Sequence, residues 1–340
     1  MTVKNGKRTE DGVMKKIRIG IYGYGNIAKS VEKAISVSND TVLAAVFTRR
    51  DPKELKISTP GVPVAAADRA VEFKDKIDVM LMCGGSATDL PIQGPAMAEH
   101  FNIVDSYDTH AKIPQYLDAV GRQAEKGKRA AVISVGWDPG LFSMMRSLFT
   151  SVLPEGKDDT FWGPGVSQGH SDAIRRVEGV ADGIQYTIPI ADAVEKVRKG
   201  SSEEMTARQK HKRVCYIVAK EGADRKKITR TIKEMPNYFE PYDTEVNFIT
   251  AEELKRDHKG MPHGGFVFRT GTTGEGDKHV VEFSLKLDSN PGFTGSVMVA
   301  YARAAFRLSN EKDFGAKTVF DIPLSYLSPK DRKELIKEML

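Results

Sequence analysis

The chain has 340 residues, of which 40% are hydrophobic and 29% are charged, and its formal net charge is +5. This length allows two domains with hydrophobic cores of their own. The small net charge, with basic and acidic residues interspersed, argues against nucleic acid as a partner. No apolar run approaches the ~20 residues that a membrane-spanning helix needs, which argues against a membrane protein.

The N-terminal residues and the two cysteines indicate the cellular compartment in which the protein resides. Residues 1–15 are polar and contain no apolar segment of the kind found in signal peptides, so we expect a disordered lead-in. Cys83 and Cys215 lie in apolar stretches and do not have the CxxC spacing. We therefore expect buried thiols in a reducing compartment, the cytoplasm.

Residues 16–35 hold the most informative motif of the first half. Ile17, Ile19 and Ile21 indicate a short strand, G-x-G-x-x-A follows at 23–28, and an amphipathic helical pattern then begins. Between a strand and a helix this motif is typical of dinucleotide binding, because the glycines permit a tight turn and a close approach to a pyrophosphate. The alternative is a glycine turn between unrelated elements. The predicted cofactor contacts are Gly23, Tyr24, Gly25, Asn26 and Ile27.

The first half then alternates between strands and helices. Apolar runs predict strands at 41–48, 77–83, 101–107 and 129–135, and helical patterns fill 89–100 and 111–126. Apolar strands that alternate with helices indicate an α/β fold, a Rossmann-type doubly wound parallel sheet covered on both faces. Ligands of such sheets lie outside the carboxyl ends of the strands, so the residues that follow each strand are the candidates for function.

The second and third strands end in residues that suit a phosphorylated cofactor. Thr48, Arg49 and Arg50 stand where an NAD enzyme usually has an acidic residue, and arginine there favours the 2′-phosphate of NADP. The alternative is a pair of solvated arginines in a loop. Small residues after the third strand allow a close approach to the cofactor, and we expect Asp89 to cap the next helix. The predicted contacts in this segment are Cys83, Gly84, Ser86, Ala87 and Thr88.

Two carboxylates follow neighbouring strands. Asp108 comes after the fourth predicted strand, and Asp138 comes after the fifth, next to Trp137. Each aspartate alone is compatible with a turn or a helix cap. Together they predict a receptor for a cation, because the carboxyl ends of adjacent parallel strands lie at one edge of the sheet.

The second half has a different pattern. A helix at 141–153 leads to strand-like runs at 184–190, 211–220, 245–250, 265–270 and 279–288, with helices at 192–199 and 224–234. Polar alternation in these runs predicts a second, α+β domain with a mixed or antiparallel sheet. The charged stretch 195–213 is the predicted mobile loop, with a solvated helix and turn as the alternative. A long helix at 291–310 is expected to return the chain to the first domain.

Three further patterns in this half could carry chemistry. Residues 165–169 match the G-x-S-x-G motif of hydrolases, but Pro164 precedes it and Gly-His-Ser-Asp follows, so we expect a ligand-binding loop. The seven histidines show no metal-ligand spacing, which predicts no metal site. Several polar residues lie near predicted strand ends, and their spacing alone does not assemble them: Thr187, Arg213, His263 and Asn290.

Matching blocks run from Lys16 to Leu327 and include GYGNIAKSVEK, SVGWDPGLFS and FWGPGVSQGHSDAIRR. Through these blocks the sequence resembles the meso-diaminopimelate dehydrogenase family. Ala28 stands where a glycine is more common, and the lead-in looks like an extension. The resemblance implies an NADP-dependent, reversible oxidative deamination of meso-2,6-diaminopimelate at its D-centre, which gives L-2-amino-6-oxopimelate, ammonia and NADPH. It also implies a homodimer.

The resemblance further implies a role for each matched residue. Asp108 and Asp138 would be catalytic and face the D-centre amine, with Asp108 also near the cofactor and Trp137 shaping the pocket. The D-centre carboxylate would be held by Gln168 and Gly169, with Ser171 and Asp172 nearby. The distal carboxylate would meet Thr187, Arg213 and His263, with Asn290 fixing the L-centre.

The sequence also predicts domain boundaries, and it leaves two rival functions open. We expect a cofactor domain at 16–140 with a return at 291–340, and a substrate-binding and dimerisation domain at 141–290. One rival is another NADP-dependent amino- or hydroxy-acid dehydrogenase, which does not need two separate sites that bind substrate carboxylates. The other is a non-catalytic NADP-binding sensor, which needs no acids facing an amine.

Overall fold

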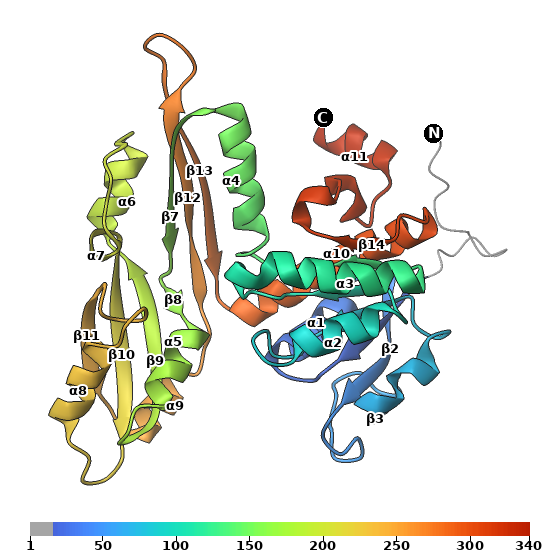
Figure 1. Cartoon of the computed structure of the whole chain (residues 1–340), viewed down its shortest axis with the longest axis horizontal. Coiled ribbons are helices and arrows are strands. Elements are labelled where there is room, and N and C mark those ends of the chain that lie inside the picture. The colour runs from blue at the N-terminus through green and yellow to red at the C-terminus, as the bar shows by residue number, and fades with distance from the viewer. Residues whose placement is uncertain (1–15) are drawn as a thin grey trace. The chain divides into compact units, whose positions relative to one another are not determined.

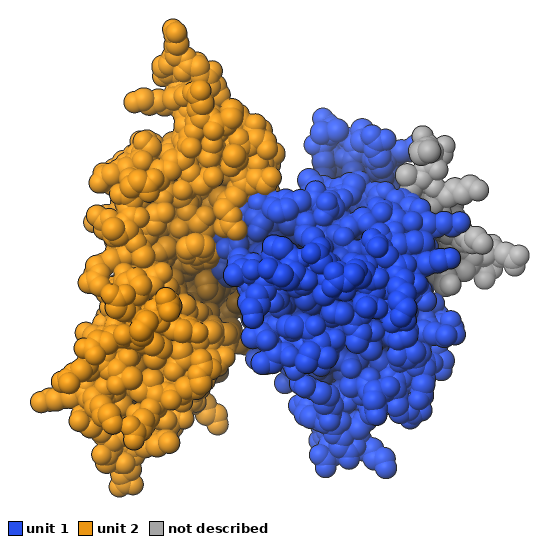
Figure 2. Space-filling view, viewed as in Figure 1, with its two compact units in different colours: residues 1–144, 291–340 blue, residues 145–290 orange. Residues whose placement is uncertain are grey.

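The computed structural model describes residues 16–340, so the predicted disordered lead-in at 1–15 lies outside the described residues. The chain divides into two compact units, which Figure 2 colours separately: unit 1 contains 1–144 and 291–340, and unit 2 contains 145–290. Between residues 16 and 340, no helix is both long and apolar enough to cross a membrane.

Unit 1 is built from short strands that alternate with helices (Figure 1). Its first part contains β1 Ile17–Tyr22, α1 Asn26–Ser36, β2 Thr41–Thr48, β3 Val64–Ala66, β4 Val79–Met82, α2 Leu90–Ala98, β5 Ile103–Asp105, α3 Ile113–Gly127 and β6 Ala130–Val132. α4 Leu141–Val152 follows, and the chain returns to unit 1 through α10 Asn290–Asn310, β14 Gly315–Lys317 and α11 Arg332–Met339. The five predicted strands, their intervening helices and the long return helix are confirmed.

The strands of unit 1 form one parallel, seven-stranded sheet in the order β14-β6-β5-β4-β1-β2-β3. The order reverses between β1 and β4, as in doubly wound folds, and ligands of such sheets bind at this switch point. The edge strands β3 and β14 were not predicted. Each has only three residues, and Pro63 before β3 and Lys317 at the end of β14 interrupt the apolar pattern.

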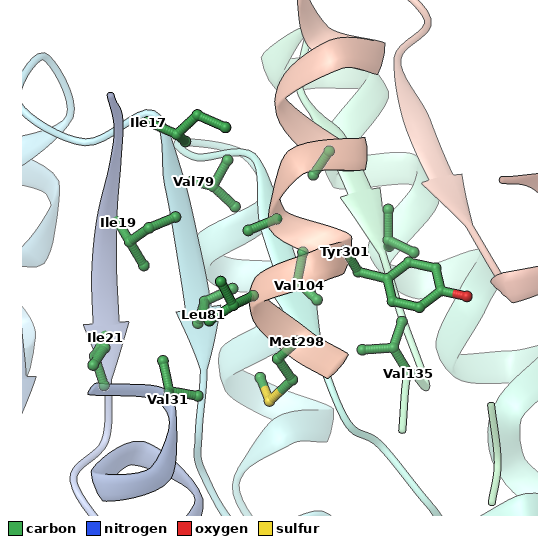
Figure 3. Close-up of a cluster of buried hydrophobic side chains, with 14 of the residues drawn as sticks. Ile17, Ile19, Ile21, Val31, Val79, Leu81, Val104, Val135, Met298 and Tyr301 are labelled. Atoms are coloured by element: carbon green, nitrogen blue, oxygen red, sulfur yellow. The ribbon is translucent and has the colours of Figure 1, made fainter. Parts of the chain in front are cut away.

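Helices cover both faces of this sheet. Figure 3 shows one face, where Ile19, Leu81 and Val104 of the sheet meet Val31 of α1 and Met298 of α10. α1 and α10 approach so closely that a Cβ on Gly295 would lie 2.7 Å from the backbone nitrogen of Val31. α2 and α3 cover the opposite face through a second cluster of buried residues. Burial on both faces explains why the central strands are mainly apolar.

Unit 2 contains two sheets with short helices (Figure 1). Its elements are β7 Glu155–Trp162, β8 Gly165–Val166, α5 Gln168–Arg175, β9 Val180–Pro189, α6 Ala191–Arg198, α7 Ala207–Lys210, β10 His211–Ala219, α8 Arg225–Lys233, β11 Asp243–Phe248, α9 Ala251–Asp257, β12 His263–Thr272 and β13 Lys278–Leu287. The four-stranded sheet β11-β10-β9-β8 is mixed, because β10 and β11 are parallel and its other pairs are antiparallel. The sheet β13-β12-β7 is antiparallel. The predicted α+β character is confirmed.

Several segments of unit 2 differ from the sequence-based expectation: the short elements β8, α5 and α9 were not predicted, and neither were β7 and the structure of 195–213. β7 was not predicted, because Asp158 and Asp159 interrupt its pattern; Asp159 is nevertheless buried and pairs with Lys157 and Lys210. The stretch 195–213, expected to be a mobile loop, contains the end of α6, all of α7 and the start of β10. The alternative of a solvated helix and turn describes it better, and a capping box formed by Thr206 and Gln209 begins α7.

Candidate active site

The glycine loop of unit 1 has the geometry of a phosphate cradle. Gly23 has φ +86°, and a Cβ there would lie 3.3 Å from the carbonyl of Cys83, so glycine is required. A Cβ on Gly25 would meet nothing within 4 Å, which leaves open space beside the N-terminus of α1. The first turn of α1, which includes Asn26 and Ile27, has no acidic side chain to repel an anion. These features fit a pyrophosphate.

The end of β2 adds two exposed cations to this cradle. The backbone N–H of Arg50 donates to Thr48 Oγ1 at 3.1 Å, and its Nη2 donates to the carbonyl of Tyr24 at 2.5 Å. Arg49 pairs with Asp89, with both guanidinium–carboxylate distances at 3.0 Å. The geometry therefore ties Arg50 to the glycine loop and Arg49 to the segment after β4. Two arginines beside a dinucleotide loop fit a cofactor that carries a 2′-phosphate.

The prediction for Asp89 was wrong in its detail. Asp89 occupies the N-cap position of α2, but its backbone is already helical, with φ −95° and ψ −52°, and its side chain makes no capping bond. Its carboxylate instead accepts the N–H of Gly85 at 2.9 Å and pairs with Arg49. Asp89 thus closes the loop after β4 on itself and orients a predicted cofactor residue.

The other predicted contacts after β4 differ in exposure. Cys83 is buried, and burial raises the pKa of its thiol. Gly84 is half-buried, whereas Ala87 and Thr88 are exposed on the turn. Ser86 Oγ accepts the backbone N–H of Asp108 at 2.9 Å, so the loop after β4 holds the loop after β5.

The two predicted catalytic aspartates follow neighbouring strands, because β5 and β6 pair directly. Asp108 is exposed three residues after β5, and Asp138 is half-buried six residues after β6. Trp137 is 8% exposed and stacks edge-on against Phe142, with ring centroids 5.3 Å apart. Both aspartates therefore stand at the carboxyl edge of the sheet, as predicted.

A residue that sequence reasoning missed joins these two loops. Asp105, the last residue of β5, is fully buried, and its Oδ1 accepts the N–H groups of Tyr107 and Ser134, each at 3.0 Å. Its Oδ2 accepts the hydroxyl of Tyr116 at 2.8 Å. Burial raises the pKa of Asp105, and the three donors oppose that shift. Only the acidic end of an otherwise apolar strand could have signalled this role.

In unit 2 the first turn of α5 presents predicted residues to open space. Gln168 and Gly169 are exposed, and a Cβ on Gly169 would meet nothing within 4 Å. Ser171 is buried; its hydroxyl donates to the carbonyl of Ser167 and accepts the N–H of Gln185 at 3.0 Å. Asp172 is exposed and pairs with Arg175. Ser171 therefore fixes α5 on β9, and Gln168 and Gly169 are the residues of this turn that face outward.

The G-x-S-x-G segment lacks the architecture of a nucleophile elbow. β8 is only two residues long and lies at a sheet edge, and α5 has only eight residues. Ser167 Oγ does lie 2.7 Å from Nδ1 of His170. Burial, together with the charge of Arg213, lowers the pKa of His170 to about 4. The pair lies within the first turn of α5 and caps none of its backbone N–H groups, consistent with a ligand-binding loop rather than a hydrolase site.

Arg213 is the centre of a buried polar cluster in unit 2. It lies opposite Thr187 in the β9–β10 register, donates to the Thr187 hydroxyl and stacks on the ring of Tyr242 at 3.9 Å. It is 7% exposed, and this burial lowers the pKa of its guanidinium. Within residues 16–340 its Nε is buried without a hydrogen-bond partner. A buried guanidinium with a spare donor is suited to a carboxylate. Tyr242 was missed, because nothing in the sequence links it to Arg213.

His263 and Asn290 lie next to the same sheet. His263, 8% exposed, begins β12, and its Nδ1 accepts the N–H of Gly264 at 2.8 Å. A Cβ on Gly165 would lie 2.5 Å from the Cα of His263, and Gly165 pairs with Thr187. The N–H of Asn290 donates to the carbonyl of Met261, two residues before His263. The fold thus gathers Thr187, Arg213 and His263, which the sequence could not assemble.

The described part of the chain contains no group of three or more acidic, histidine or cysteine side chains that could hold a metal ion. The charged and polar groups gathered at the two sites are instead suited to organic anions and cations.

Comparisons with known proteins point to one family. A sequence model of the diaminopimelic acid dehydrogenase C-terminal domain matches residues 136–289. The chain is 59% identical to the meso-diaminopimelate D-dehydrogenase of Ureibacillus thermosphaericus, over 96% of this chain and 100% of that protein. It is 55% identical to a substituted meso-dapdh of Clostridium tetani E88 solved with DAP, with a TM-score of 0.91 over 96% of this chain and 100% of that one. An engineered D-amino acid dehydrogenase bound to NADP+ is 42% identical, with a TM-score of 0.84 and the same coverage.

Proposed function

This chain belongs to the meso-diaminopimelate D-dehydrogenase family, and on that premise we propose the reaction that it catalyses. Meso-2,6-diaminopimelate, NADP+ and water give L-2-amino-6-oxopimelate, ammonium, NADPH and a proton, and the reaction is reversible. The observation that carries this proposal is 59% identity to a meso-diaminopimelate D-dehydrogenase over 96% of the chain. The cofactor cradle of unit 1 and the polar cluster of unit 2 give it a chemical basis.

The residues of unit 1 fit NADP. Gly23 and Gly25 with the first turn of α1 would hold the pyrophosphate, and Arg49 and Arg50 with Thr48 would hold the 2′-phosphate. Gly84, Ser86 and their neighbours would line the same cradle. When bound, the nicotinamide accepts the hydride that leaves the D-centre carbon. The chain must therefore bind the substrate, orient it and remove a proton from its amine.

Asp108 and Asp138 are the proposed catalytic groups. The substrate arrives as an ammonium, and hydride can leave the carbon only after nitrogen has regained a lone pair. A carboxylate at the nitrogen is a suitable base, directly or through water. Once hydride has left, the iminium carries a positive charge, which two carboxylates at the sheet edge stabilise. Buried Trp137 beside Asp138 would exclude water from one side of the amine.

The residues of unit 2 are proposed to hold the two carboxylates. The N–H of Gly169 and the side chain of Gln168, at the N-terminus of α5, would hold the D-centre carboxylate, with Ser171 and Asp172 behind them. Arg213, Thr187 and His263 would hold the distal carboxylate, and Asn290 would fix the L-centre. The buried, spare Nε donor of Arg213 is the structural feature that favours this assignment.

Location and assembly are part of the same proposal. NADP-dependent chemistry together with two buried, unpaired thiols suits the cytoplasm. We propose that unit 1 is the cofactor domain and that unit 2 carries the substrate contacts and the surface of a homodimer. Light scattering coupled to gel filtration checks the assembly: a single species with the mass of one chain contradicts the dimer.

Stereochemistry provides the primary test. The purified enzyme is incubated with NADP and, separately, meso-, LL- and DD-diaminopimelate, and NADPH formation is followed by absorbance. We expect strong turnover with the meso isomer, little with the LL isomer, and little when NAD replaces NADP. Turnover of simple amino acids with no preference for the meso isomer supports the rival amino-acid dehydrogenase. NADP binding without turnover of any isomer supports the non-catalytic sensor.

The role of Asp138 is tested by Asp138→Asn. This change keeps the size of the side chain and removes the base, so kcat should fall by about 10²-fold or more, with NADP affinity within about twofold of the native value. The matched control is Asp118→Asn, which changes an exposed aspartate on α3 and should leave kcat unaltered. Native turnover in Asp138→Asn contradicts the assignment.

A further inference from the structure

Glu32 is a buried carboxylate that the proposed reaction does not use. It lies in α1 on the face that packs into the core, between Val31 and Ile35, and it is 2% exposed. A carboxylate removed from water is strongly destabilising unless hydrogen-bond donors replace the water. The identity of its donors therefore indicates what the side chain does.

Its donors come from two separate loops of unit 1. The hydroxyl of Tyr24, in the glycine loop, donates to Oε2 of Glu32. The backbone N–H and the hydroxyl of Thr59, in the segment after β2, donate to Oε1 at 2.5 and 2.7 Å. Burial, reinforced by the bond to Glu32, raises the pKa of Tyr24 to about 12, so this hydroxyl stays a donor at neutral pH. One carboxylate thus joins the two loops.

These two loops carry the proposed phosphate contacts. The carbonyl of Tyr24 accepts from Nη2 of Arg50 at 2.5 Å, which continues the chain of bonds from Glu32 to a proposed ligand of the 2′-phosphate. Leu55, Ile57 and Val62, from the segment that contains Thr59, pack against the hydrophobic cluster of unit 1. The segment after β2 is therefore fixed both by apolar contacts and by Glu32.

We propose that Glu32 is a positioning residue that sets the preference for the 2′-phosphorylated cofactor. The inference rests on the proposed placement of the 2′-phosphate at Arg49 and Arg50. A guanidinium contributes most when it is already held where the phosphate will lie, because no ordering is then needed on binding. Glu32 fixes Tyr24, and Tyr24 fixes Arg50 relative to the pyrophosphate loop. NAD lacks the 2′-phosphate, so its binding depends far less on this arrangement.

The test compares the dissociation constants of NADP and NAD by calorimetry in Glu32→Gln and Tyr24→Phe. Losing a hydrogen bond to a buried carboxylate should shift Arg50 and weaken NADP about tenfold. The effect on NAD should be no more than about threefold, so the NAD-to-NADP ratio of dissociation constants falls. Tyr24→Phe keeps the inference testable if Glu32→Gln fails to fold.

The matched control is Tyr326→Phe. Tyr326 also donates to a glutamate, Glu311, and the bond likewise raises its pKa to about 12, but this pair joins the end of α10 to the segment after β14 and includes no residue of the glycine loop. The control should leave the ratio unchanged. Equal weakening of both nucleotides in Tyr24→Phe and Glu32→Gln, or a loss of thermal stability without a change in the ratio, overturns the inference.

Arg50→Met separates this inference from the placement on which it rests. It should lower the ratio more than either of the other changes, because it removes the proposed phosphate ligand itself. An unchanged ratio in Arg50→Met overturns the proposed phosphate site. A lowered ratio in Arg50→Met with an unchanged ratio in Tyr24→Phe and Glu32→Gln overturns only the role of Glu32.

Discussion

The proposed cofactor site of unit 1 and the proposed distal carboxylate site of unit 2 present polar groups to their ligands in different ways. Among the proposed ligand contacts of unit 1, Gly25, Arg49, Arg50 and Asp108 are exposed. The buried carboxylates, Glu32 and Asp105, lie one layer behind them. In unit 2 the proposed distal contacts, Thr187, Arg213 and His263, are themselves buried side chains.

The difference follows from the chemistry of the two ligands. A pyrophosphate can be held by backbone N–H groups and a helix N-terminus, which remain hydrated before binding. The distal carboxylate is proposed to be oriented by a fixed guanidinium, and burial against Tyr242 fixes Arg213. The proposed phosphate contacts of unit 1 therefore remain largely solvated. The proposed distal site of unit 2 contains a charged side chain, Arg213, that folding has already removed from water.

The strongest test of this contrast is Arg213→Met. Removing a buried guanidinium that is proposed to bind the distal carboxylate should forfeit about 2–3 kcal/mol, which corresponds to a rise of about 10²-fold in KM for diaminopimelate. NADP affinity should stay native, and simpler D-amino acids should become better substrates, more so with His263→Asn added. Steady-state kinetics measures both effects. The control is Arg208→Met, an exposed arginine paired with Asp243; an unchanged KM in Arg213→Met would refute the distal site.

Tyr116→Phe tests the role of buried Asp105, which lies behind the proposed ligand contacts of unit 1. This change removes a donor to buried Asp105, so the free energy of unfolding should fall by about 2 kcal/mol. Because Asp105 also joins the loops of Asp108 and Asp138, kcat should fall several-fold with NADP affinity unchanged. Denaturant unfolding and single-turnover kinetics measure the two effects. If stability falls and kcat does not, Asp105 is purely structural.

Two glycines with open space around them, one in each unit, sharpen the contrast. Gly25→Ala places a methyl where the pyrophosphate is proposed to lie and should weaken NADP about tenfold. Gly169→Ala should raise KM for diaminopimelate by a similar factor and leave NADP unaffected. Neither change meets a neighbouring atom, so both melting temperatures should stay native. A variant that weakens both ligands equally would contradict the separate assignments.

The smallest expected effect concerns the pH dependence of stability. Burial, with the charges of Arg213 and Lys210, lowers the pKa of His211 from 6.5 to about 4, and its Nε2 accepts the N–H of Trp162 at 2.9 Å. As the pH drops, His211 is therefore protonated at a higher pH in the unfolded chain than in the folded chain. The free energy of unfolding falls as the pH drops from about 6.5 towards 4. His211→Gln keeps an acceptor that does not titrate, so it should reduce the loss at about pH 5 by about 1–2 kcal/mol. Urea unfolding at neutral and acid pH checks this, and an unchanged pH dependence contradicts it.

Much of unit 1 was predictable because its signals are local. β1, β2, α3 and α10 follow from apolar periodicity, and the glycine motif follows from its position between β1 and α1. β3 and β14 were missed because Pro63 before β3 and Lys317 at the end of β14 interrupt the apolar pattern of these short strands. β7 was missed because its aspartates interrupt the apolar pattern. The sequence does not show that Asp159 is buried and that two lysines neutralise its charge.

The sequence by itself determined the α/β alternation, the glycine motif between β1 and α1, the two arginines after β2 and the carboxylates at two strand ends. Each depends on neighbours within about ten residues along the chain, where helix and strand geometry fix the arrangement. Only the tertiary structure decided what meets across the fold: Asp89 with Arg49, Asp105 between two loops, Glu32 with Tyr24 and Thr59, and Arg213 with Tyr242. The partners of a buried charge come from segments that the fold brings together. These segments can lie far apart in the sequence, so their spacing does not predict the contact.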